Sequence, residues 1–256
     1  MTLDETLLAD ITEEKIRSIS KRNIIEQEEV LLPERKLKTK KVYDIYKKVE
    51  RKIYFVVKRV FDVICSLIGI MLLIPISIVV KISYLITGDT ESIFYKQKRI
   101  GKNGRLFDFY KIRTMIPNAD EKLDIILEND EELAEEYSKN KKLKNDPRIT
   151  KVGKFLRKTS LDEFPQFINV IKGDMSVIGN RPYLPREKQD MKEYYDSIVK
   201  TKCGIVSYWA VMGRSDISFK NRCEIEKFYS YNYGFRLDAK IFFKVIKVVL
   251  CRRGAV

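Results

Sequence analysis

One long uncharged segment dominates the pattern of hydrophobic and polar positions. Residues 63–80 include no charged side chain over eighteen positions, close to the shortest length with which a helix crosses a bilayer. Pro75 lies inside this segment, where it removes a backbone donor and clashes with the preceding turn. We therefore expect one helix that bends at Pro75.

Basic residues on both sides of this segment bear on its orientation. Lys58 and Arg59 precede it, and Lys81, Lys96 and Lys98 follow it. The positive-inside bias puts both flanks on the cytoplasmic side, which a helix that enters one leaflet and returns can satisfy. A core helix of a soluble protein and a helix that crosses the membrane once are the alternatives that this pattern leaves open.

The rest of the pattern predicts a hairpin and several helices. Asn103-Gly104 lies between segments rich in aromatic and β-branched residues, which indicates a β-hairpin with a two-residue turn. Residues 118–145 are mostly charged and are expected to be solvent-exposed. Residues 151–158 and 235–253 have the spacing of amphipathic helices. The second of these fits either a helix in the lipid headgroup plane or a core helix.

These elements predict the fold class and three regions. We expect an α/β protein of the α+β kind, mainly helical, with a re-entrant membrane helix, a small β-hairpin and interfacial amphipathic helices. The regions are a polar helical extension (1–50), the re-entrant membrane helix (51–90) and a compact cytosolic catalytic domain (91–256). The extension lacks the apolar core of a signal peptide, and its role is not indicated by its sequence.

Composition narrows the chemistry. Of 256 residues, 45% are hydrophobic, which is enough for a substantial core, and the net charge of +14 favours nucleic acid, anionic lipid or phosphorylated substrates as partners. The chain has no histidine, which excludes Ser-His-Asp triads and His-ligated zinc. Its four cysteines are widely spaced, which argues against a zinc knuckle or a redox motif.

Two adjacent carboxylates, Asp162 and Glu163, are the strongest candidates for chemistry. Arg157 and Lys158 precede them, and in such a basic setting one carboxylate can attack phosphorus while the other binds a divalent cation. Pro165 fits only near a helix start, where free backbone amides attract phosphate. The alternative is structural, since Ser160 and Glu163 have the spacing of a capping box.

Two short stretches downstream are expected to form turns. Gly173-Asp174-Met175-Ser176 carries an acid, and Gly179-Asn180-Arg181-Pro182 carries an arginine.

The order of short motifs resembles the bacterial sugar transferase family, the monotopic polyprenyl-phosphate phosphoglycosyl transferases. The resemblance covers the chain from about Lys58 to its end. It rests on Lys58-Arg59-x-Phe61-Asp62, the apolar segment with its proline, Arg99-x-Gly101-x-x-Gly104, Tyr110-Lys111-x-Arg113-Thr114-Met115, Asp146-Pro147-Arg148, Arg157-x-x-Ser160-Leu161-Asp162-Glu163-x-Pro165-Gln166, Gly173-Asp174-Met175-Ser176 and Arg181-Pro182.

The resemblance implies an enzyme on the cytoplasmic face of the cell membrane. It would transfer a sugar 1-phosphate from a UDP-sugar to polyprenyl (undecaprenyl) phosphate, release UMP and require Mg2+, as the first membrane step of exopolysaccharide, capsule or glycoconjugate assembly. Carried over by position, Asp162 is the nucleophile of a covalent phosphosugar intermediate and Glu163 binds the metal. Phosphate or substrate groups would be held by Lys111, Arg113, Arg148, Arg157 and Arg181, and the nucleotide-sugar by Arg214.

The chain departs from the family pattern near the expected nucleotide site. Asn180 stands where the family has proline, and the stretch from Cys203 to Val211 lacks the usual proline, second glycine and glutamine, with Ser207 and Ala210 among the residues in their place. These departures leave the sugar open. The oligomeric state is also open, and a homo-oligomer is compatible with the sequence.

Two other functions are compatible with parts of the sequence. A membrane-tethered basic module that binds nucleic acid or anionic lipid would explain the charge, but not the acid pair or the ordered motifs. An inactive relative that serves as a scaffold would explain the altered nucleotide-site residues. The enzyme explains the charge, the apolar segment, the acid pair and the ordered motifs, so we expect lipid and nucleotide-sugar partners and no nucleic acid.

Overall fold

The computed structural model describes residues 34–140, 143–212 and 217–250, with side chains placed for 47–138, 143–212 and 217–245. The chain divides into two units, Met1–Lys52 and Ile53–Val256. In the first unit the described residues are helical, whereas the rest of the predicted N-terminal extension lies outside the described residues. The second unit contains both sheets, the core and the acid pair.

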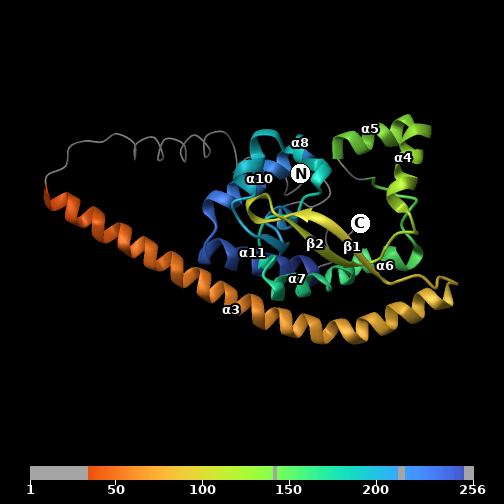
Figure 1. The fold of residues 1–256 in the computed structure, drawn as a ribbon, viewed down its shortest axis with the longest axis horizontal. Helices are drawn as coiled ribbons and strands as arrows, with labels where there is room; N and C mark the ends of the chain where they lie inside the picture. Colours follow the sequence, from red (N-terminus) through yellow and green to blue (C-terminus); the bar gives the residue numbers. More distant parts are fainter. Residues whose placement is uncertain (1–33, 141–142, 213–216, 251–256) are drawn as a thin grey trace. The chain divides into compact units, whose positions relative to one another are not determined.

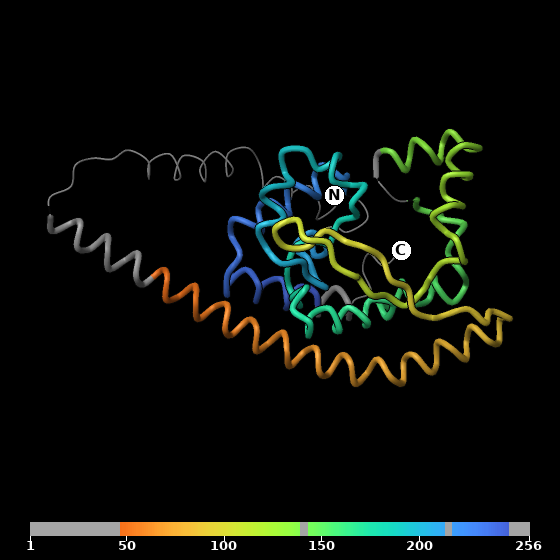
Figure 2. Tube along the Cα trace, in the orientation of Figure 1, coloured from red at the N-terminus to blue at the C-terminus, as the bar shows by residue number. Residues whose placement is uncertain are grey.

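The uncharged segment lies in helix α3, Glu34–Ile86, which continues through Pro75 without interruption. Figure 1 shows the axis of α3 curving within its second half, and Figure 2 shows the chain turning back from its end into the first strand. The portion Lys47–Ile86 is long and apolar enough to cross a membrane, and only 22% of its most apolar window is buried. The core-helix alternative is therefore wrong, because apolar side chains remain exposed along this helix, among them Val56, Leu67, Met71, Ile78 and Ile86.

The predicted hairpin is present. Strands β1, Phe94–Ile100, and β2, Leu106–Ile112, pair antiparallel with Ile100 opposite Leu106. The turn is longer than the two residues predicted, since residues 101–105 connect the strands and include the 3-10 turn η1, Lys102–Gly104. Asn103 and Gly104 nevertheless adopt the left-handed backbone, with φ of 57° and 77°. Their residue types therefore predicted the local conformation but not the loop length.

A second sheet was not predicted. Strands β3, Met175–Ile178, and β4, Cys203–Val206, pair in parallel. The expected turn at 173–176 is thus confined to Gly173-Asp174, because Met175 already begins β3. The backbones approach closely at Gly179 and Gly204, where a side chain on either residue would collide with the other strand.

The remaining elements are helices and short 3-10 turns. Within the charged segment 118–145, residues 119–129 and 131–140 form two helices whose described side chains are mostly exposed or half-buried. The amphipathic helix expected at 151–158 is present, and the one expected at 235–253 is present over 235–250, with 251–253 outside the described residues. In chain order the elements are α4 (Ala119–Asn129), α5 (Glu131–Asn140), α6 (Lys151–Thr159), η2 (Leu161–Glu163), α7 (Gln166–Lys172), η3 (Pro185–Glu187), α8 (Lys188–Met191), η4 (Lys192–Tyr194), α9 (Tyr195–Ile198), η5 (Trp209–Val211), α10 (Phe219–Asn232) and α11 (Phe235–Leu250).

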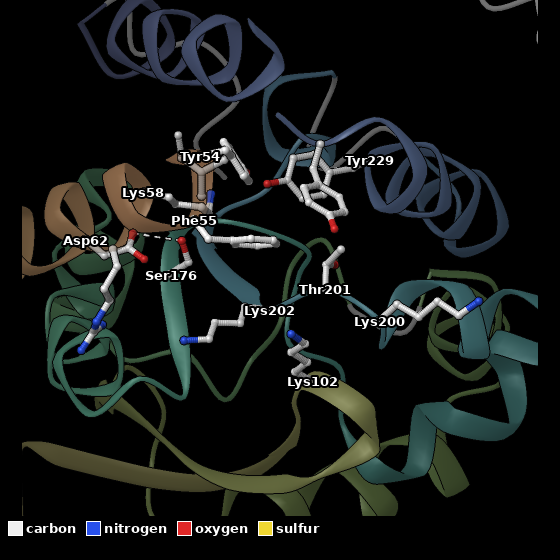
Figure 3. Close-up of a pocket in the computed structure, with 13 residues that line it drawn as sticks. Tyr54, Phe55, Lys58, Asp62, Lys102, Ser176, Lys200, Thr201, Lys202 and Tyr229 are labelled. Atoms are coloured by element: carbon white, nitrogen blue, oxygen red, sulfur yellow. Dashed lines mark hydrogen bonds between the residues drawn. The ribbon is translucent and has the colours of Figure 1, made fainter. Parts of the chain in front are cut away.

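Within the second unit, α3 is attached to the core along its length. Near its start Asp62 is buried and accepts hydrogen bonds from Ser176 Oγ at 2.9 Å and Val177 N at 2.8 Å (Figure 3). Near its end Tyr84 is buried and its hydroxyl donates to Arg113 O at 2.7 Å. Apolar residues between these two points pack on the core through one face of the helix, which leaves the other face uncovered.

The contact between α6 and the end of β2 predicts a large effect of a small substitution. A Cβ atom at Gly153 would collide with the backbone carbonyl of Thr114, which cannot move without shifting the strand end. Although alanine is the better helix former, we expect Gly153→Ala to lower the free energy of unfolding by about 1–3 kcal/mol through overpacking. Chemical denaturation of the two chains in detergent measures the difference in unfolding free energy.

Gly234→Ala is the matched control, because a Cβ atom there meets nothing within 4 Å. It should change the free energy of unfolding by less than about 1 kcal/mol. Equal effects of the two substitutions would contradict the close packing of α6 on Thr114.

Candidate active site

The acid pair occupies a tight turn between two helices. Helix α6 ends at Ser160, which adopts the left-handed backbone with φ 57° and donates its N–H to Arg157 O at 3.2 Å. The Ser160 side chain caps no helix, so the capping-box alternative is wrong. Pro165 begins α7 at its N-cap, as the sequence predicted. The 3-10 turn η2 between them directs Asp162 inward, where it is 5% exposed, and leaves Glu163 half-buried.

Lys111 joins the two carboxylates. Its Nζ lies 3.0 Å from Asp162 Oδ2 and 3.3 Å from Glu163 Oε1. Strand β2 places Lys111 here because Asn169 of α7 holds that strand, donating to Asp108 O at 2.6 Å and accepting from Tyr110 N at 3.1 Å. One ammonium thus neutralises part of the charge of two adjacent acids.

The environment of Asp162 raises the pKa of its carboxyl. Burial is the largest cause, and the charge of Glu163 acts in the same direction, while Lys111 and Arg157 oppose both by favouring the ionised form. Burial also lowers the pKa of Arg157, and the charge of Asp162 opposes this. Burial removes water that would solvate an attacking carboxylate, and the two cations favour the ionised form that attack requires.

Further arginines lie within electrostatic range of Arg157. Its Nε donates to Thr114 Oγ1 at 3.0 Å, and the charge of Arg181 acts on it. Arg99, to which the sequence argument assigned no role, is a neighbour of Arg181: burial, together with the charge of Arg181, lowers the pKa of Arg99 to about 10. Its membership of the Arg99-x-Gly101 motif was the available signal. Arg157, Arg181 and Arg99 are thus cations that repel one another in pairs, Arg157 with Arg181 and Arg181 with Arg99, and such an environment is one that phosphate groups complement.

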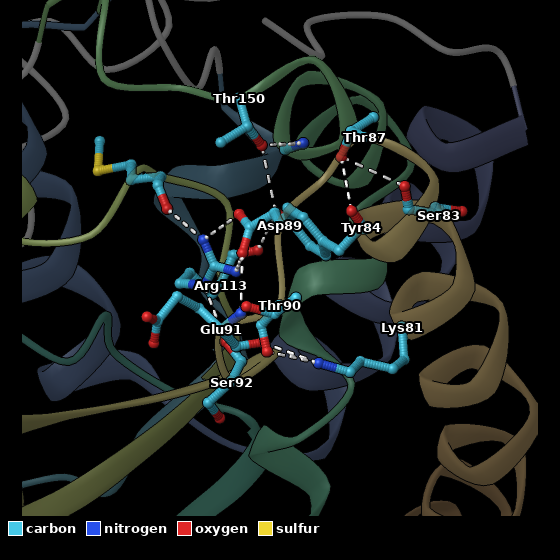
Figure 4. Close-up of polar contacts among 12 residues, drawn as sticks. Lys81, Ser83, Tyr84, Thr87, Asp89, Thr90, Glu91, Ser92, Arg113 and Thr150 are labelled. Atoms are coloured by element: carbon cyan, nitrogen blue, oxygen red, sulfur yellow. Dashed lines mark hydrogen bonds and ion pairs between the residues drawn. The ribbon is translucent and has the colours of Figure 1, made fainter.

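Two predicted phosphate-binding residues have other partners. Arg113 forms a paired contact with Asp89, with Nη1 and Nη2 at 3.0 and 2.8 Å from its carboxylate oxygens (Figure 4). Arg148 pairs with Asp146 in the same way, with Nη2 at 2.6 Å and Nε at 2.8 Å. Both guanidinium groups are therefore neutralised away from the acid pair. Arg214 lies outside the described residues.

Arg181 links the acid pair region to a buried polar cluster. Its guanidinium lies 5.1 Å from the Trp209 ring centre, and its backbone N–H donates to Glu226 Oε2 at 2.8 Å. Glu226 is fully buried on α10, and burial raises the pKa of its carboxyl to about 7. Arg181 Nε and Trp209 Nε1 are buried and have no partner among the described residues. The sequence did not indicate Glu226, because α10 carries it here from a distant part of the chain.

The residues that depart from the family pattern lie around this cluster. Asn180 donates from Nδ2 to Ser230 Oγ at 2.6 Å, and Cys203 is buried in β4. Ser207 is buried beside Glu226 and lowers the pKa of its carboxyl, and Ser207 Oγ accepts from Ala210 N at 3.3 Å. Asn180 and Ser207 thus both contact polar side chains of α10.

The acid pair offers two carboxylates to a divalent cation. Among the described residues no three Asp, Glu or Cys side chains gather into a metal site. Mg2+ in proteins is commonly bound by one or two carboxylates together with water and substrate phosphates. Asp162 and Glu163 offer such a pair, and the ammonium of Lys111 between them shows that positive charge is accommodated there.

Comparison with known proteins identifies the family of this chain. The model of the family described as bacterial sugar transferase matches residues 53–252. The chain belongs to the bacterial sugar transferase family. The resemblance predicted from the ordered motifs is thus confirmed.

Individual members of the bacterial sugar transferase family show how far the likeness extends. Undecaprenyl-phosphate galactose phosphotransferase of Salmonella typhimurium is 42% identical over 198 residues, which cover 77% of this chain and 41% of that protein. The UDP-galactose-lipid carrier transferase of Erwinia amylovora is 39% identical, with the same coverage of 77% and 41%. Exopolysaccharide production protein ExoY of Rhizobium meliloti is 37% identical over 202 residues, 77% of this chain and 87% of that protein. The chain thus spans about two fifths of the first two relatives.

The raised pKa of Glu226 predicts a pH-dependent stability. The native state binds this proton more tightly than the unfolded chain, so the free energy of unfolding should fall as pH rises from about 4.5 to about 7. In Glu226→Gln this contribution is absent. The difference in unfolding free energy between the two chains should therefore change by about 3 kcal/mol across that range, as thermal or chemical unfolding in detergent measures.

Glu224→Gln provides the control on the same helix, because Glu224 is exposed. The difference in unfolding free energy between Glu224→Gln and the parent chain should stay nearly constant with pH. If the difference in unfolding free energy for Glu226→Gln is also independent of pH, folding does not raise the pKa of Glu226.

Proposed function

We propose that the chain transfers a sugar 1-phosphate from a UDP-sugar to polyprenyl (undecaprenyl) phosphate through a covalent intermediate on Asp162, with release of UMP. The observation that carries the proposal is the buried Asp162 carboxylate, bound by Lys111 at 3.0 Å and within electrostatic range of Arg157. The names of the relatives, which act on undecaprenyl phosphate or a lipid carrier, support the substrate classes.

In the first half-reaction an oxygen of Asp162 attacks the phosphorus that carries the sugar. Lys111 donates to Oδ2 of Asp162 and not to Oδ1. We therefore assign the attack to Oδ1 of Asp162. The new Asp162–phosphorus bond forms as the bond from that phosphorus to the bridging oxygen breaks, and UMP leaves with the electron pair. Arg157 and Arg181 stabilise the negative charge that develops on the phosphate oxygens.

In the second half-reaction a phosphate oxygen of the lipid acceptor attacks the same phosphorus. The bond to Asp162 breaks, the carboxylate is regenerated, and the product is a polyprenyl diphosphate sugar. The carboxylate returns to the ammonium of Lys111, which stabilises it as a leaving group. A two-step scheme suits one soluble and one lipid substrate, because the two need never occupy the site together.

Glu163 is the residue that we assign to Mg2+, together with the phosphates of the donor. Glu163 is half-buried, and its Oε1 lies 3.3 Å from Lys111 Nζ, so its carboxylate reaches the same region as the reacting group. The metal would supply charge neutralisation to the departing phosphate, in addition to that from the arginines.

The attachment of α3 supports a monotopic placement on the membrane. Residues 54–84 span about 45 Å as a helix, yet Tyr54 hydrogen-bonds Asp238 and Tyr84 hydrogen-bonds Arg113 O in the same unit. A helix that crossed the bilayer would carry one of these ends to the opposite side. An exposed apolar face between two attached ends instead suits a helix embedded in one leaflet, with the acid pair on the cytoplasmic face.

This placement is compatible with the first membrane step of exopolysaccharide, capsule or glycoconjugate assembly. ExoY is named for exopolysaccharide production, and a relative from Streptococcus agalactiae is a galactosyl transferase, CpsE. The sugar carried by the donor is not assigned.

Replacement of the nucleophile should abolish the covalent step. Without acceptor, the parent chain in detergent with Mg2+ and a UDP-sugar should release about one UMP per chain and gain the mass of a sugar phosphate. Asp162→Asn should lower UMP release at least about a thousandfold and gain no mass, because the amide is a poor nucleophile. The measurements are a UMP assay and intact-protein mass spectrometry over a panel of UDP-sugars.

Asp124→Asn makes the same change on exposed α4 and should behave like the parent chain. Normal UMP release by Asp162→Asn would remove Asp162 from the proposed role.

The position of Lys111 predicts a shift in the pH dependence of turnover. Asp162 must be ionised to attack, and its raised pKa places the acidic fall in kcat/KM at a higher pH than for an ordinary aspartate. Lys111→Met removes a cation that stabilises the ionised form, so that fall should move to still higher pH. The measurement is a pH profile of kcat/KM.

Lys122→Met, on exposed α4, serves as the control and should leave the profile unchanged. An unshifted profile for Lys111→Met would contradict the role of Lys111 in stabilising Asp162.

A further inference from the structure

A basic cavity lies beside the start of α3 in the second unit. Five cationic residues line it, together with an aromatic wall that includes Tyr54, Phe55 and Tyr229 (Figure 3). Its volume is about 120 Å3, which is below the usual range for sites that enclose a whole small molecule. The cavity therefore suits a single charged group, such as a phosphate. Its cationic residues are Lys58, Arg59, Lys102, Lys200 and Lys202.

Two of these cations already have protein partners. Lys58 is ion-paired with Asp238, and Arg59 donates to Val170 O and Ile171 O at 2.7 and 2.8 Å. The acid in the cavity wall, Asp62, is occupied by hydrogen bonds to β3.

Lys102 and Lys202 differ from those two cations. Within the described part of the chain neither forms an ion pair with a carboxylate within 4.0 Å, although Asp62 and Asp174 act on Lys202 at longer range. Burial, Arg59 and Lys102 lower the pKa of Lys202, which shows that the cations repel one another. In Figure 3 the Lys102 side chain extends from the hairpin loop toward the cavity. An anion would relieve this repulsion.

The surroundings indicate which kind of anion reaches this cavity. Phe55 lines the cavity and is 46% exposed, and Val56, Val57 and Val60 on the same turns of α3 are also exposed. These side chains belong to the apolar face that we place in the membrane. A ligand with a phosphate and hydrocarbon chains would match both surfaces, as a phospholipid at the membrane surface does.

The cavity is separate from the acid pair. Lys102 lies in the loop at one end of the hairpin, and Lys111 lies near the other end of β2. The seven residues from Arg105 to Lys111 extend about 20 Å along an extended strand. A phosphate bound at Lys102 therefore does not reach Asp162, and the ligand is not the acceptor in its reacting position.

We propose that this cavity binds the phosphate of an anionic phospholipid headgroup through Lys102 and Lys202, with the lipid chains along the exposed face of α3. Such a lipid would hold the hairpin loop and the start of α3 at the membrane surface. The site is independent of the proposed transfer reaction.

Lipid binding to the full chain tests the proposal. The chain in an uncharged detergent is titrated with dihexanoyl phosphatidylglycerol, dihexanoyl phosphatidylcholine and inorganic phosphate, and bound molecules are counted by native mass spectrometry. The parent chain should bind the anionic lipid at least tenfold more tightly than the other two ligands. The double variant K102Q/K202Q should lose this preference. The single variant Lys102→Gln guards against poor folding of the double variant, because Lys102 is exposed. It should weaken binding of the anionic lipid severalfold.

K192Q/K220Q is the matched control, because it removes the same charge from two exposed lysines that do not line the cavity. It should bind the anionic lipid like the parent chain, as should Asp162→Asn, which separates this site from catalysis. The proposal would be overturned if K192Q/K220Q lost as much of the preference for the anionic lipid as K102Q/K202Q does. It would also be overturned if K102Q/K202Q kept that preference. Equally tight, lysine-dependent binding of inorganic phosphate would reject the lipid as its ligand.

Discussion

The contact between Lys111 and the two carboxylates of Asp162 and Glu163 is the interaction on which the site depends. Two adjacent acids, one of them 5% exposed, repel each other and lose hydration on burial, and a cation between them offsets both effects. The contact requires β2, η2 and α7 to meet at one point, and Asn169 holds two of these elements together. The fold around the acid pair is therefore organised to keep one ammonium in place.

In the proposed function helix α3 positions this site at a membrane. It is tied to the core by buried polar groups near both ends of its segment in the second unit, Asp62 and Tyr84, while its apolar face stays uncovered between them. The Arg113–Asp89 pair reinforces the second attachment, since Arg113 belongs to the segment after β2 and Asp89 follows the end of α3. A residue type typical of phosphate binding here connects two structural elements instead.

The sequence predicted local features better than long-range ones. The hairpin, the amphipathic helices and the helix start at Pro165 follow from nearby residues, and each is present. The parallel pair of β3 and β4 was missed because each strand has four residues and the chain between them carries no strand signal. The partners of Arg113 and the burial of Glu226 depend on elements distant along the chain, so residue type and spacing alone could not indicate them.

The close approach of Gly153 to Thr114 has a further consequence for the arrangement of charges. Thr114 follows the strand that carries Lys111, and Gly153 lies in the helix that carries Arg157. The separation between the backbone positions of Lys111 and Arg157 is thus set by main-chain atoms in close contact and not by the size of intervening side chains. Neighbouring side chains can consequently change while the backbone positions that carry charge toward Asp162 keep their separation.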